Sequence, residues 1–401
     1  MSGLTTETKS WLFGPYGRIE FGRGAAAGIG DAAAQFGRRC LVCTDAAMRD
    51  AGLVEPVVSS LEAAGCEVAV FDRGLPEVPV AVISECAEFG REFGPDVLVG
   101  VGGGSSIDLT KVAAVLLSHG GEPRDYYGEF QVPGPVLPVI AMPTTAGTGS
   151  EVTPVAVVGD DDIYLKVGIA SRHLVPGWAV LDPELTVTCP PSVTAHAGLD
   201  ALSHAVEAFT AASFESLSGA PSSRRIFTGK NPVSDALAKE AIRLVGLNLR
   251  RCFETPTDVD AREGMLQASL FAGLAFAAAG TALVHAMQYP LGALTKRPHG
   301  LVNAILMPAV ANFNLEARRD SYAEVASLLT GKPTEPEELP ELLRGLNRDL
   351  GIPAGLAAID VADDDLERVA ELTMGVERLL RINPRKVKDP AEVVAVLQEA
   401  M

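Results

Sequence analysis

Apolar residues in the first 190 positions alternate between short β-branched runs and longer Ala-rich segments. The runs CLVCTD, EVAVFD, DVLVGVGGGS, PVIAMPTT and WAVLD, separated by Gly and Pro, predict strands. The segments VEPVVSSLEAAG and PVAVISECAEFGREFG have the period of helices. Because alternating strands and helices are typical of βαβ units, we expect a mainly parallel sheet covered by helices on both faces.

After Pro190 and Pro191 the strand patterns stop and the remaining sequence predicts helices. The helical segments are LDALSHAVEAFTA, PVSDALAKEAIRLVGLNLRRCF, AREGMLQASLFAGLAFAAAGTALVHAM, SYAEVASLLTG and PAEVVAVLQEA. We therefore predict an α/β domain at residues 1–191 and an all-helical domain at residues 192–401. Residues 213–230 are polar and rich in turn formers, which predicts an exposed loop.

A candidate metal site begins with Asp200 and His204. Side chains four residues apart lie on one face of a helix, so these two can reach one point. His285, which we expect at the end of a long apolar helix, and His299, which follows Pro298 where a loop turns into a new helix, supply two further ligands. An isolated Asp-x3-His pair is a weak signal, but buried polar side chains in an apolar half need partners. Three imidazoles and one carboxylate, without a thiolate, suit Fe(II) or Zn(II).

A glycine cluster marks a candidate phosphate site. Gly102, Gly103 and Gly104, followed by Ser105 and Asp108, come directly after a strongly predicted strand and open a helix. Glycines let the backbone approach a diphosphate, and a helix N-terminus offers free N–H groups. A tight turn alone can also require glycine, but three in succession at a strand-to-helix junction favour phosphate binding.

Further polar residues follow other predicted strands. Asp45 ends CLVCTD, where a carboxylate can accept hydrogen bonds from an adenosine ribose and repel a 2′-phosphate, and it can equally cap the next helix. Thr144, Thr145 and Thr148 lie on a glycine-bearing loop and can contact a cofactor or cap the following element. Lys166 is flanked by apolar residues on a predicted strand, which suggests that it meets an anion or a cofactor hydroxyl.

Composition excludes some classes of function. The 401 residues are 47% hydrophobic and 21% charged, which is ordinary for a globular protein, and the net charge of −18 argues against nucleic acid as a partner. No segment has the length of uncharged apolar sequence that a membrane span requires, and the N-terminus lacks a basic start followed by an apolar stretch, so we expect a cytoplasmic protein without a membrane partner. We interpret the scattered cysteines as buried small hydrophobes, not as disulfides or redox pairs; they are Cys40, Cys43, Cys66, Cys86, Cys189 and Cys252.

Several long motifs, in the same order, give the chain a family resemblance. They are GGGSSIDLTK, MPTTAGTGSEVT, AGLDALSHAVEA, NPVSDALAKEAIRL and the block VHAMQYPLG with PHGLVNAILMP. On these motifs the chain resembles the iron-containing (group III) alcohol dehydrogenases over nearly its whole length. The resemblance implies a Rossmann-like, nucleotide-binding α/β domain followed by an all-α metal-binding domain, in a dehydroquinate synthase-like architecture with catalysis in the cleft between them.

The resemblance also implies the residues of the site. Asp200, His204, His285 and His299 would bind Fe(II), or in some members Zn(II). The resemblance implies that Asp45 lies near the adenosine ribose and that Gly102, Gly103, Gly104 and Ser105 surround the diphosphate, next to Asp108 of the glycine cluster. It places the remaining residues along the cofactor, and these are Thr144, Thr145, Thr148, Lys166 and Leu185. The implied enzyme is an NAD(H)-linked alcohol dehydrogenase or aldehyde reductase for a small primary alcohol and its aldehyde, with NAD(H) favoured over NADP(H), and it is a homodimer or larger.

Two departures from the family pattern bear on the chemistry. Many relatives carry a second histidine four residues after position 285, where this chain has Tyr289, a hydrogen-bond donor but a weaker proton relay at neutral pH. In an acidic chain, the basic residues near the predicted cleft suggest a substrate with a carboxylate, phosphonate or sulfonate, although solvated surface charge explains them equally well. These residues are Arg224, Arg225, Lys230, Lys296 and Arg297.

Two other functions remain open from the sequence. A nicotinoprotein or transhydrogenase would use the same site without releasing its cofactor. A metal-dependent lyase of the dehydroquinate synthase-like superfamily would use the nucleotide only transiently. Net consumption of NADH separates the dehydrogenase from both.

Overall fold

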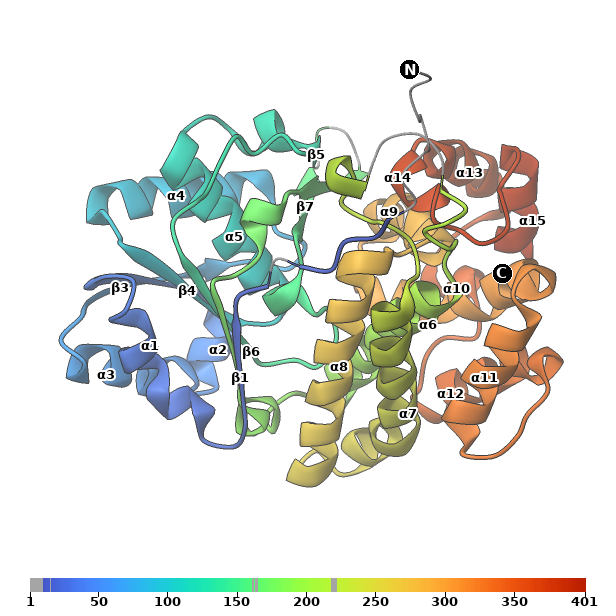
Figure 1. The fold of residues 1–401 in the computed structure, drawn as a ribbon, viewed down its shortest axis with the longest axis horizontal. Helices are drawn as coiled ribbons and strands as arrows, with labels where there is room; N and C mark the ends of the chain where they lie inside the picture. The colour runs from blue at the N-terminus through green and yellow to red at the C-terminus, as the bar shows by residue number, and fades with distance from the viewer. Residues whose placement is uncertain (1–9, 15, 161, 163–164, 218–221) are drawn as a thin grey trace, which may run out of the picture.

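The chain folds into an α/β part and a helical part that lie side by side. The computed structural model describes residues 10–14, 16–160, 162, 165–217 and 222–401 (Figure 1). The blue-to-green α/β part occupies one side of the view, and the yellow-to-red helices of the second half occupy the other. The fold class expected from the sequence is confirmed.

The α/β part is built on a six-stranded sheet in which every pairing is parallel. The strand order is β1-β9-β6-β4-β2-β3. All five strands predicted from β-branched runs are present, and β1 is added at the edge. The strands are β1 (Arg18–Phe21), β2 (Arg39–Asp45), β3 (Glu67–Gly74), β4 (Val97–Gly102), β6 (Val139–Pro143) and β9 (Trp178–Leu181).

Helices cover both faces of this sheet. On β2, Leu41 and Cys43 pack in the same cluster as residues of α4 and α5, whereas Cys40 and Val42 pack in the cluster that contains α1 and α3. This alternation follows from the two-residue period of a strand. All six cysteines are free and buried, which confirms their interpretation as small hydrophobes. The helices of this part are α1 (Ile29–Ala33), α2 (Ala46–Asp50), α3 (Val54–Ala63), α4 (Val80–Phe93) and α5 (Gly104–His119).

The strand order places a crevice at the carboxyl ends of the central strands. The chain runs from β2 outward to β3 and then returns to β4 on the other side of β2. Ligands of such sheets bind where the direction of strand addition reverses. Asp45, Gly102 and Pro143 end the neighbouring strands β2, β4 and β6, so residues that follow them meet at this edge.

A small second sheet lies between the main sheet and the helices. It consists of β5 (Gly128–Glu129), β8 (Leu165–Ala170) and β7 (Val155–Asp160), in that order. The strand predicted around Lys166 is therefore confirmed as β8. Helix α5 contacts β7 and helix α9 contacts β8, so this sheet connects the two parts.

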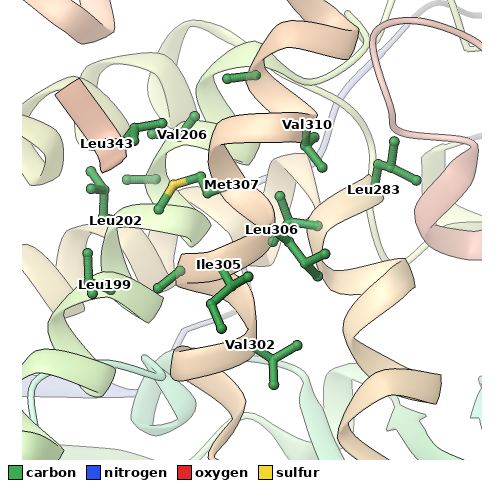
Figure 2. Packing of buried hydrophobic residues seen from close by; sticks show 14 of the residues in the cluster. Leu199, Leu202, Val206, Leu283, Val302, Ile305, Leu306, Met307, Val310 and Leu343 are labelled. Carbon is green, nitrogen blue, oxygen red and sulfur yellow. The ribbon is translucent and has the colours of Figure 1, made fainter. Parts of the chain in front are cut away.

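The second part of the chain is helical. Its core surrounds α10, where Val302, Ile305, Leu306, Met307 and Val310 point in several directions toward the neighbouring α6, α9 and α12 (Figure 2). Helix α6 begins at Pro191, and the division into domains at 1–191 and 192–401 stays a prediction. The helices are α6 (Pro191–Thr210), α7 (Pro232–Glu254), α8 (Val259–Ala279), α9 (Leu283–Thr295), α10 (His299–Asn314), α11 (Arg319–Thr330), α12 (Leu339–Asp349), α13 (Leu366–Met374), α14 (Glu377–Leu380) and α15 (Pro390–Glu399).

The long apolar helix expected to end at His285 is instead two helices. Helix α8 ends at Ala279, and Gly280 has a φ of 98°, a conformation that glycine adopts readily. Helix α9 then begins at Leu283 at an angle of 104° to α8. His285 therefore lies in the first turn of a new helix. Among the described residues no single helix is long and apolar enough to cross a membrane, and this bent pair meets the criteria of length and composition only when taken together.

The predicted exposed loop at 213–230 is also wrong in its second half. Residues 218–221 lie outside the described residues, but residues 225–229 are buried. Ile226 and Phe227 belong to the helical core, and Thr228 hydrogen-bonds to the Ala278 carbonyl. Two large apolar side chains therefore anchor a segment whose polar composition predicts solvent exposure.

Candidate functional site

One carboxylate and three imidazoles converge where three helices of the second part meet. Asp200 and His204 lie one turn apart on α6, His285 lies on α9, and His299 is the first residue of α10. Asp200 Oδ1 lies 3.9 Å from His204 Nε2, 3.8 Å from His285 Nε2 and 3.5 Å from His299 Nε2. The ligand atoms of this four-residue cluster all lie within 4.8 Å of one another. The sequence prediction that these residues meet is thus matched by the geometry.

Glu207, which the sequence analysis missed, holds His285 in place. Its carboxylate accepts a hydrogen bond from His285 Nδ1 at 2.6 Å and from the backbone N–H groups of Ala282 and Val284 at 2.8 and 2.7 Å. The carboxylate therefore caps the N-terminus of α9 and fixes a proton on Nδ1. The lone pair of Nε2 then faces the cluster, an arrangement typical of metal-binding histidines.

His204 and Asp200 are also held by groups outside the cluster. His204 Nδ1 lies 3.4 Å from the Gly147 carbonyl, and its ring stacks on Phe276 with centroids 4.3 Å apart. The side-chain amide of Asn303 donates to Asp200 Oδ1 at 2.8 Å. The cluster is therefore oriented by α6, α8, α10 and the loop that follows β6.

Burial is the largest influence on the pKa values of His204, His299 and Asp200. It lowers the pKa of His204 to about 4 and that of His299 well below its usual value. Burial acts to raise the pKa of Asp200, but the three neighbouring histidines and the hydrogen bond from Asn303 together outweigh it, and the pKa falls below its usual value. Neutral imidazoles beside an ionised carboxylate are the forms that bind a divalent cation.

On the opposite side, Gly102, Gly103 and Gly104 form a glycine loop between β4 and α5. Gly103 is the N-cap of α5 and supplies no side-chain cap, so the first N–H groups of the helix lack a side-chain acceptor at that position. A Cβ on Gly104 would lie 2.5 Å from Thr148 Cγ2, and a Cβ on Gly103 would lie 3.4 Å from Thr145 Oγ1. The backbone is therefore uncovered at a helix N-terminus, which suits an anion.

Asp45 caps a helix and also faces the glycine loop. Its Oδ1 accepts from the Met48 N–H at 3.1 Å, and its Oδ2 accepts from Ser106 Oγ at 3.1 Å. Thr144, at the end of β6, hydrogen-bonds through Oγ1 to Met48 Sδ at 3.2 Å. The capping role left open by the sequence is therefore present, and the carboxylate still lies at the sheet edge. Leu185, in the 3-10 helix Pro183–Thr186, packs against the adjacent apolar cluster.

A cavity joins the four-residue cluster to the start of α5. It holds about 130 Å³ of space. The predicted site residues that line it are Gly104, Ser105, Asp108, Thr148, Lys166, Asp200, His204, His285, Tyr289 and His299. Six predicted site residues are not part of this lining and lie at or near the adjacent edge of the main sheet. They are Asp45, Gly102, Gly103, Thr144, Thr145 and Leu185.

Two charged residues in the lining are already paired. Both oxygens of Asp108 are engaged, Oδ1 by Ser150 Oγ at 2.5 Å and Oδ2 by the Val157 N–H at 2.9 Å. Lys166 is buried and forms an ion pair with Glu77. These contacts tie α5 and β8 to their neighbours, so each side chain has a structural partner as well as a place in the cavity wall.

The basic residues singled out in the sequence do not line the cavity. Arg224 is exposed, Lys230 pairs with Asp235 at 3.0 Å and Arg297 pairs with Asp360 at 2.8 Å. Arg225 and Lys296 are likewise absent from the cavity lining, whose residues all belong to the described part of the chain. None of the five basic residues that suggested an anionic substrate therefore contributes a positive charge to the cavity wall.

The arginine that does line the cavity is Arg378, which the sequence analysis missed. It lies on α14 and donates from Nη2 to the Tyr289 hydroxyl at 3.2 Å. Tyr289 follows His285 by four residues on α9, so both face the cavity. Arg378 is half-buried, and the surrounding segment MGVERLLRINPR gives no signal that one of its cations reaches a cavity wall.

Comparisons with known proteins agree with this architecture. Residues 16–183 match the family model described as iron-containing alcohol dehydrogenase, and residues 224–401 match the C-terminal model of the Fe-containing alcohol dehydrogenase family. The chain is 35% identical over 382 residues to the NAD-dependent methanol dehydrogenase of Bacillus methanolicus, covering 93% of this chain and 96% of that one. It is 33% identical over 370 residues to the sulfoacetaldehyde reductase of Bilophila wadsworthia, covering 90% and 91%.

A solved structure extends the likeness to the fold. The crystal structure of a 1,3-propanediol oxidoreductase superposes with a TM-score of 0.89 at 33% identity and covers 98% of this chain and 100% of that chain. Together with the buried four-residue cluster and the glycine loop, these matches assign the chain. It belongs to the iron-containing alcohol dehydrogenase family, whose members are oxidoreductases that act on CH–OH groups.

Proposed function

We propose that this enzyme interconverts a small primary alcohol and its aldehyde, with Fe(II) held by Asp200, His204, His285 and His299 and with NAD(H) bound along the glycine loop. The observation that carries the proposal is the cavity, which has the four-residue cluster on one wall and the N-terminal turn of α5 on the other. A metal ion and a nicotinamide ring would therefore face the same substrate.

The donor set fits a divalent first-row ion. Nitrogen and carboxylate ligands without thiolate suit both Fe(II) and Zn(II), and we favour Fe(II) because the family is iron-containing. A bound ion supplies Lewis-acid polarisation of the alcohol or carbonyl oxygen. The contacts of Glu207, Asn303 and the Gly147 carbonyl hold the ligands in place, so little reorganisation is needed when the ion binds.

The sheet edge fits a dinucleotide. The uncapped start of α5 offers N–H groups to a diphosphate, and a side chain at Gly104 would fill the approach. Asp45, Thr144 and Thr145 extend this edge toward the position of an adenosine ribose. We favour NAD(H) over NADP(H) because the Asp45 carboxylate would repel a 2′-phosphate.

The remaining wall residues position the substrate and exclude water. Phe227 and Phe276 are buried and line the cavity with apolar surface. The Tyr289 hydroxyl accepts a hydrogen bond from Arg378, which leaves its own hydrogen free to donate to an oxygen in the cavity. We therefore assign Tyr289 to hold a proton near the substrate oxygen, in the place of the histidine found in many relatives.

The names of similar proteins support a small substrate. Methanol, 1,3-propanediol and sulfoacetaldehyde are the compounds in the names of three of them, and the last is anionic. A homodimer or larger assembly and a cytoplasmic location stay predictions from the sequence.

The proposal is tested by NADH oxidation in chelator-stripped protein. Butanal is supplied with no metal, with Fe(II) added anaerobically or with Zn(II), and NADPH replaces NADH in a parallel series. We expect turnover that requires the metal, is highest with Fe(II), and has a lower KM for NADH than for NADPH.

Other results would favour another function. Turnover that persists without metal would contradict the proposal. Hydride exchange between an alcohol and an aldehyde without net NADH consumption, with nucleotide that co-purifies, would indicate a nicotinoprotein or transhydrogenase. Stable metal binding without any hydride transfer would leave the lyase as the better hypothesis.

A further inference from the structure

Arg378 is the one residue in the described cavity lining whose positive charge has no carboxylate partner. Lys166, the other cation of the lining, is paired with Glu77. The Asp108 carboxylate accepts a hydrogen bond from Ser150, and the Asp200 carboxylate lies beside the three histidines of the four-residue cluster. Among the described residues, Arg378 forms no ion pair within 4.0 Å.

The guanidinium also has an unused donor. Nη2 donates to the Tyr289 hydroxyl, but Nη1 is buried without a hydrogen-bond partner among the described residues. The guanidinium carbon lies 5.5 Å from the centroid of the buried Phe227 ring. A buried cationic donor without an acceptor is costly, so the site favours an incoming anion.

The neighbouring backbone makes room for this side chain. A Cβ on Gly168 of β8 would lie 2.6 Å from Arg378 Nη2 and 3.3 Å from its guanidinium carbon. Gly168 has no positive φ, so its backbone conformation does not itself require glycine. The absence of a side chain at this position therefore admits the guanidinium to the cavity wall.

The position of Arg378 relative to the cluster defines the ligand. Its partner Tyr289 lies one helical turn beyond His285, about 6 Å along the axis of α9. A short molecule with its oxygen at the four-residue cluster would thus bring its far end toward the guanidinium. Arginine presents several N–H donors in a planar fork that matches the oxygens of a carboxylate and also reaches those of a sulfonate.

We propose that Arg378 binds an oxyanion at the far end of the substrate, so that the enzyme prefers short aldehydes and alcohols that carry a carboxylate or sulfonate. This inference rests on the proposed dehydrogenase function for its reactive end. The anion subsite itself is formed by the Arg378 guanidinium beside Gly168 and can be measured separately.

The first measurement compares kcat/KM for 4-oxobutanoate and butanal, which have the same chain length, and for sulfoacetaldehyde and propanal. Wild type is expected to prefer the anionic member of each pair. Arg378→Met, which removes the charge and keeps an unbranched apolar stem, should reduce this preference about 10- to 100-fold through KM. Loss of its hydrogen bond to Tyr289 should change both members of each pair alike, so the ratio between them is the quantity compared. Gly168→Ala should reduce it in the same direction, because the added methyl group displaces the guanidinium.

Arg381→Met is the matched control. Arg381 lies on the same segment, its nearest carboxylate oxygen is Glu129 Oε1 at 3.9 Å, and it is not among the described residues that line the cavity. Its removal should leave the preference for anionic aldehydes unchanged. An equal loss in the Arg381 and Arg378 variants would assign the effect to general charge and overturn the proposal.

The second measurement uses a non-reacting probe. Calorimetry would measure the binding of ethanesulfonate to the metal-loaded protein in the presence of NAD⁺. We expect this binding to be at least about tenfold weaker in Arg378→Met than in wild type. That result with no aldehyde turned over would refute the proposed function and leave the subsite standing. Equal ethanesulfonate binding in both proteins, or an effect of Arg378→Met that is the same for neutral and anionic aldehydes, would overturn the subsite.

Discussion

The two walls of the cavity are built in opposite ways. The helical wall brings side chains together, and three members of the four-residue cluster are held by a further group such as Glu207 or Asn303. The sheet wall leaves side chains out, because the glycine loop and the uncapped start of α5 present backbone. The helical wall should therefore be sensitive to the removal of atoms, and the sheet wall to their addition.

The largest expected effect is the loss of a cluster member. His285→Ala removes one of the four ligand atoms. It also removes one of the three hydrogen-bond donors to the Glu207 carboxylate and leaves the two backbone N–H groups. We expect Fe(II)-dependent kcat/KM to fall by more than about a hundredfold, beyond the range for outer partners. His119→Ala, a change at an exposed end of α5, is the control; retention of Fe(II)-dependent activity in His285→Ala would remove this residue from the site.

A smaller effect is expected one contact away from the cluster. Glu207→Gln keeps the shape of the side chain but weakens the acceptor that orients His285. Affinity for Fe(II), measured by anaerobic titration, should fall about 10- to 100-fold, and added Fe(II) should restore part of the activity. Glu254→Gln, at the exposed end of α7, should change neither quantity. If Glu207→Gln binds Fe(II) as tightly as wild type, the carboxylate serves only to cap α9.

The sheet wall is tested by adding one methyl group. In Gly104→Ala the new Cβ would lie 2.5 Å from Thr148 Cγ2, so the loop must shift. We expect the KM for NADH to rise about tenfold while Fe(II) affinity is unchanged. Gly28→Ala is the matched control, since its Cβ would meet no atom nearer than 3.8 Å. A fall in Fe(II) affinity with an unchanged KM for NADH would reverse the roles of the two walls.

The smallest effect on activity is expected where the walls join. Glu151, in the 3-10 helix Ser150–Val152 beside α8, is buried, and burial raises its pKa from 4.5 to about 7. As the pH rises, the Glu151 carboxyl group therefore loses its proton at a lower pH in the unfolded chain than in the folded chain. The stability from this group is full below pH 4.5 and is lost as the pH rises to about 7.

The measurement for Glu151 is thermal unfolding across this pH range. The stability of wild type relative to Glu151→Gln should decrease by up to about 3 kcal/mol between pH 4.5 and pH 7. The exposed Glu62→Gln should run parallel to wild type. A difference between wild type and Glu151→Gln that does not vary with pH would mean that this carboxyl group titrates normally.

Much of the fold could be predicted because its signals are local. Five of the six strands of the main sheet are β-branched runs between Gly and Pro, and the glycine loop lies at a junction that the sequence marks clearly. The break at Gly280 had a signal, a glycine within an apolar run, but the surrounding alanines favoured a continuous helix. The burial of Phe227 could not be predicted, because it depends on a pocket formed by distant helices.

The same distinction applies to the site. The cluster was predicted because Asp200 and His204 have helical spacing and the other two histidines accompany recognisable motifs. Glu207 had only a weak signal, a carboxylate in the apolar stretch HAVEAF, and its partner His285 lies 78 positions away. Arg378 had none, since its contact with Tyr289 depends on how α14 packs beside α9.

Crystallography can test whether the four-residue cluster holds a metal ion in the same cavity as the cofactor. Crystals of protein loaded anaerobically with Fe(II) and NAD⁺ would be measured for anomalous scattering at the iron absorption edge. We expect one strong peak about 2.0–2.2 Å from a carboxylate oxygen of Asp200 and from Nε2 of His204, His285 and His299. We also expect density for a diphosphate at the start of α5. An iron peak elsewhere, or a diphosphate bound away from the glycine loop, would show that metal and cofactor do not share this cavity.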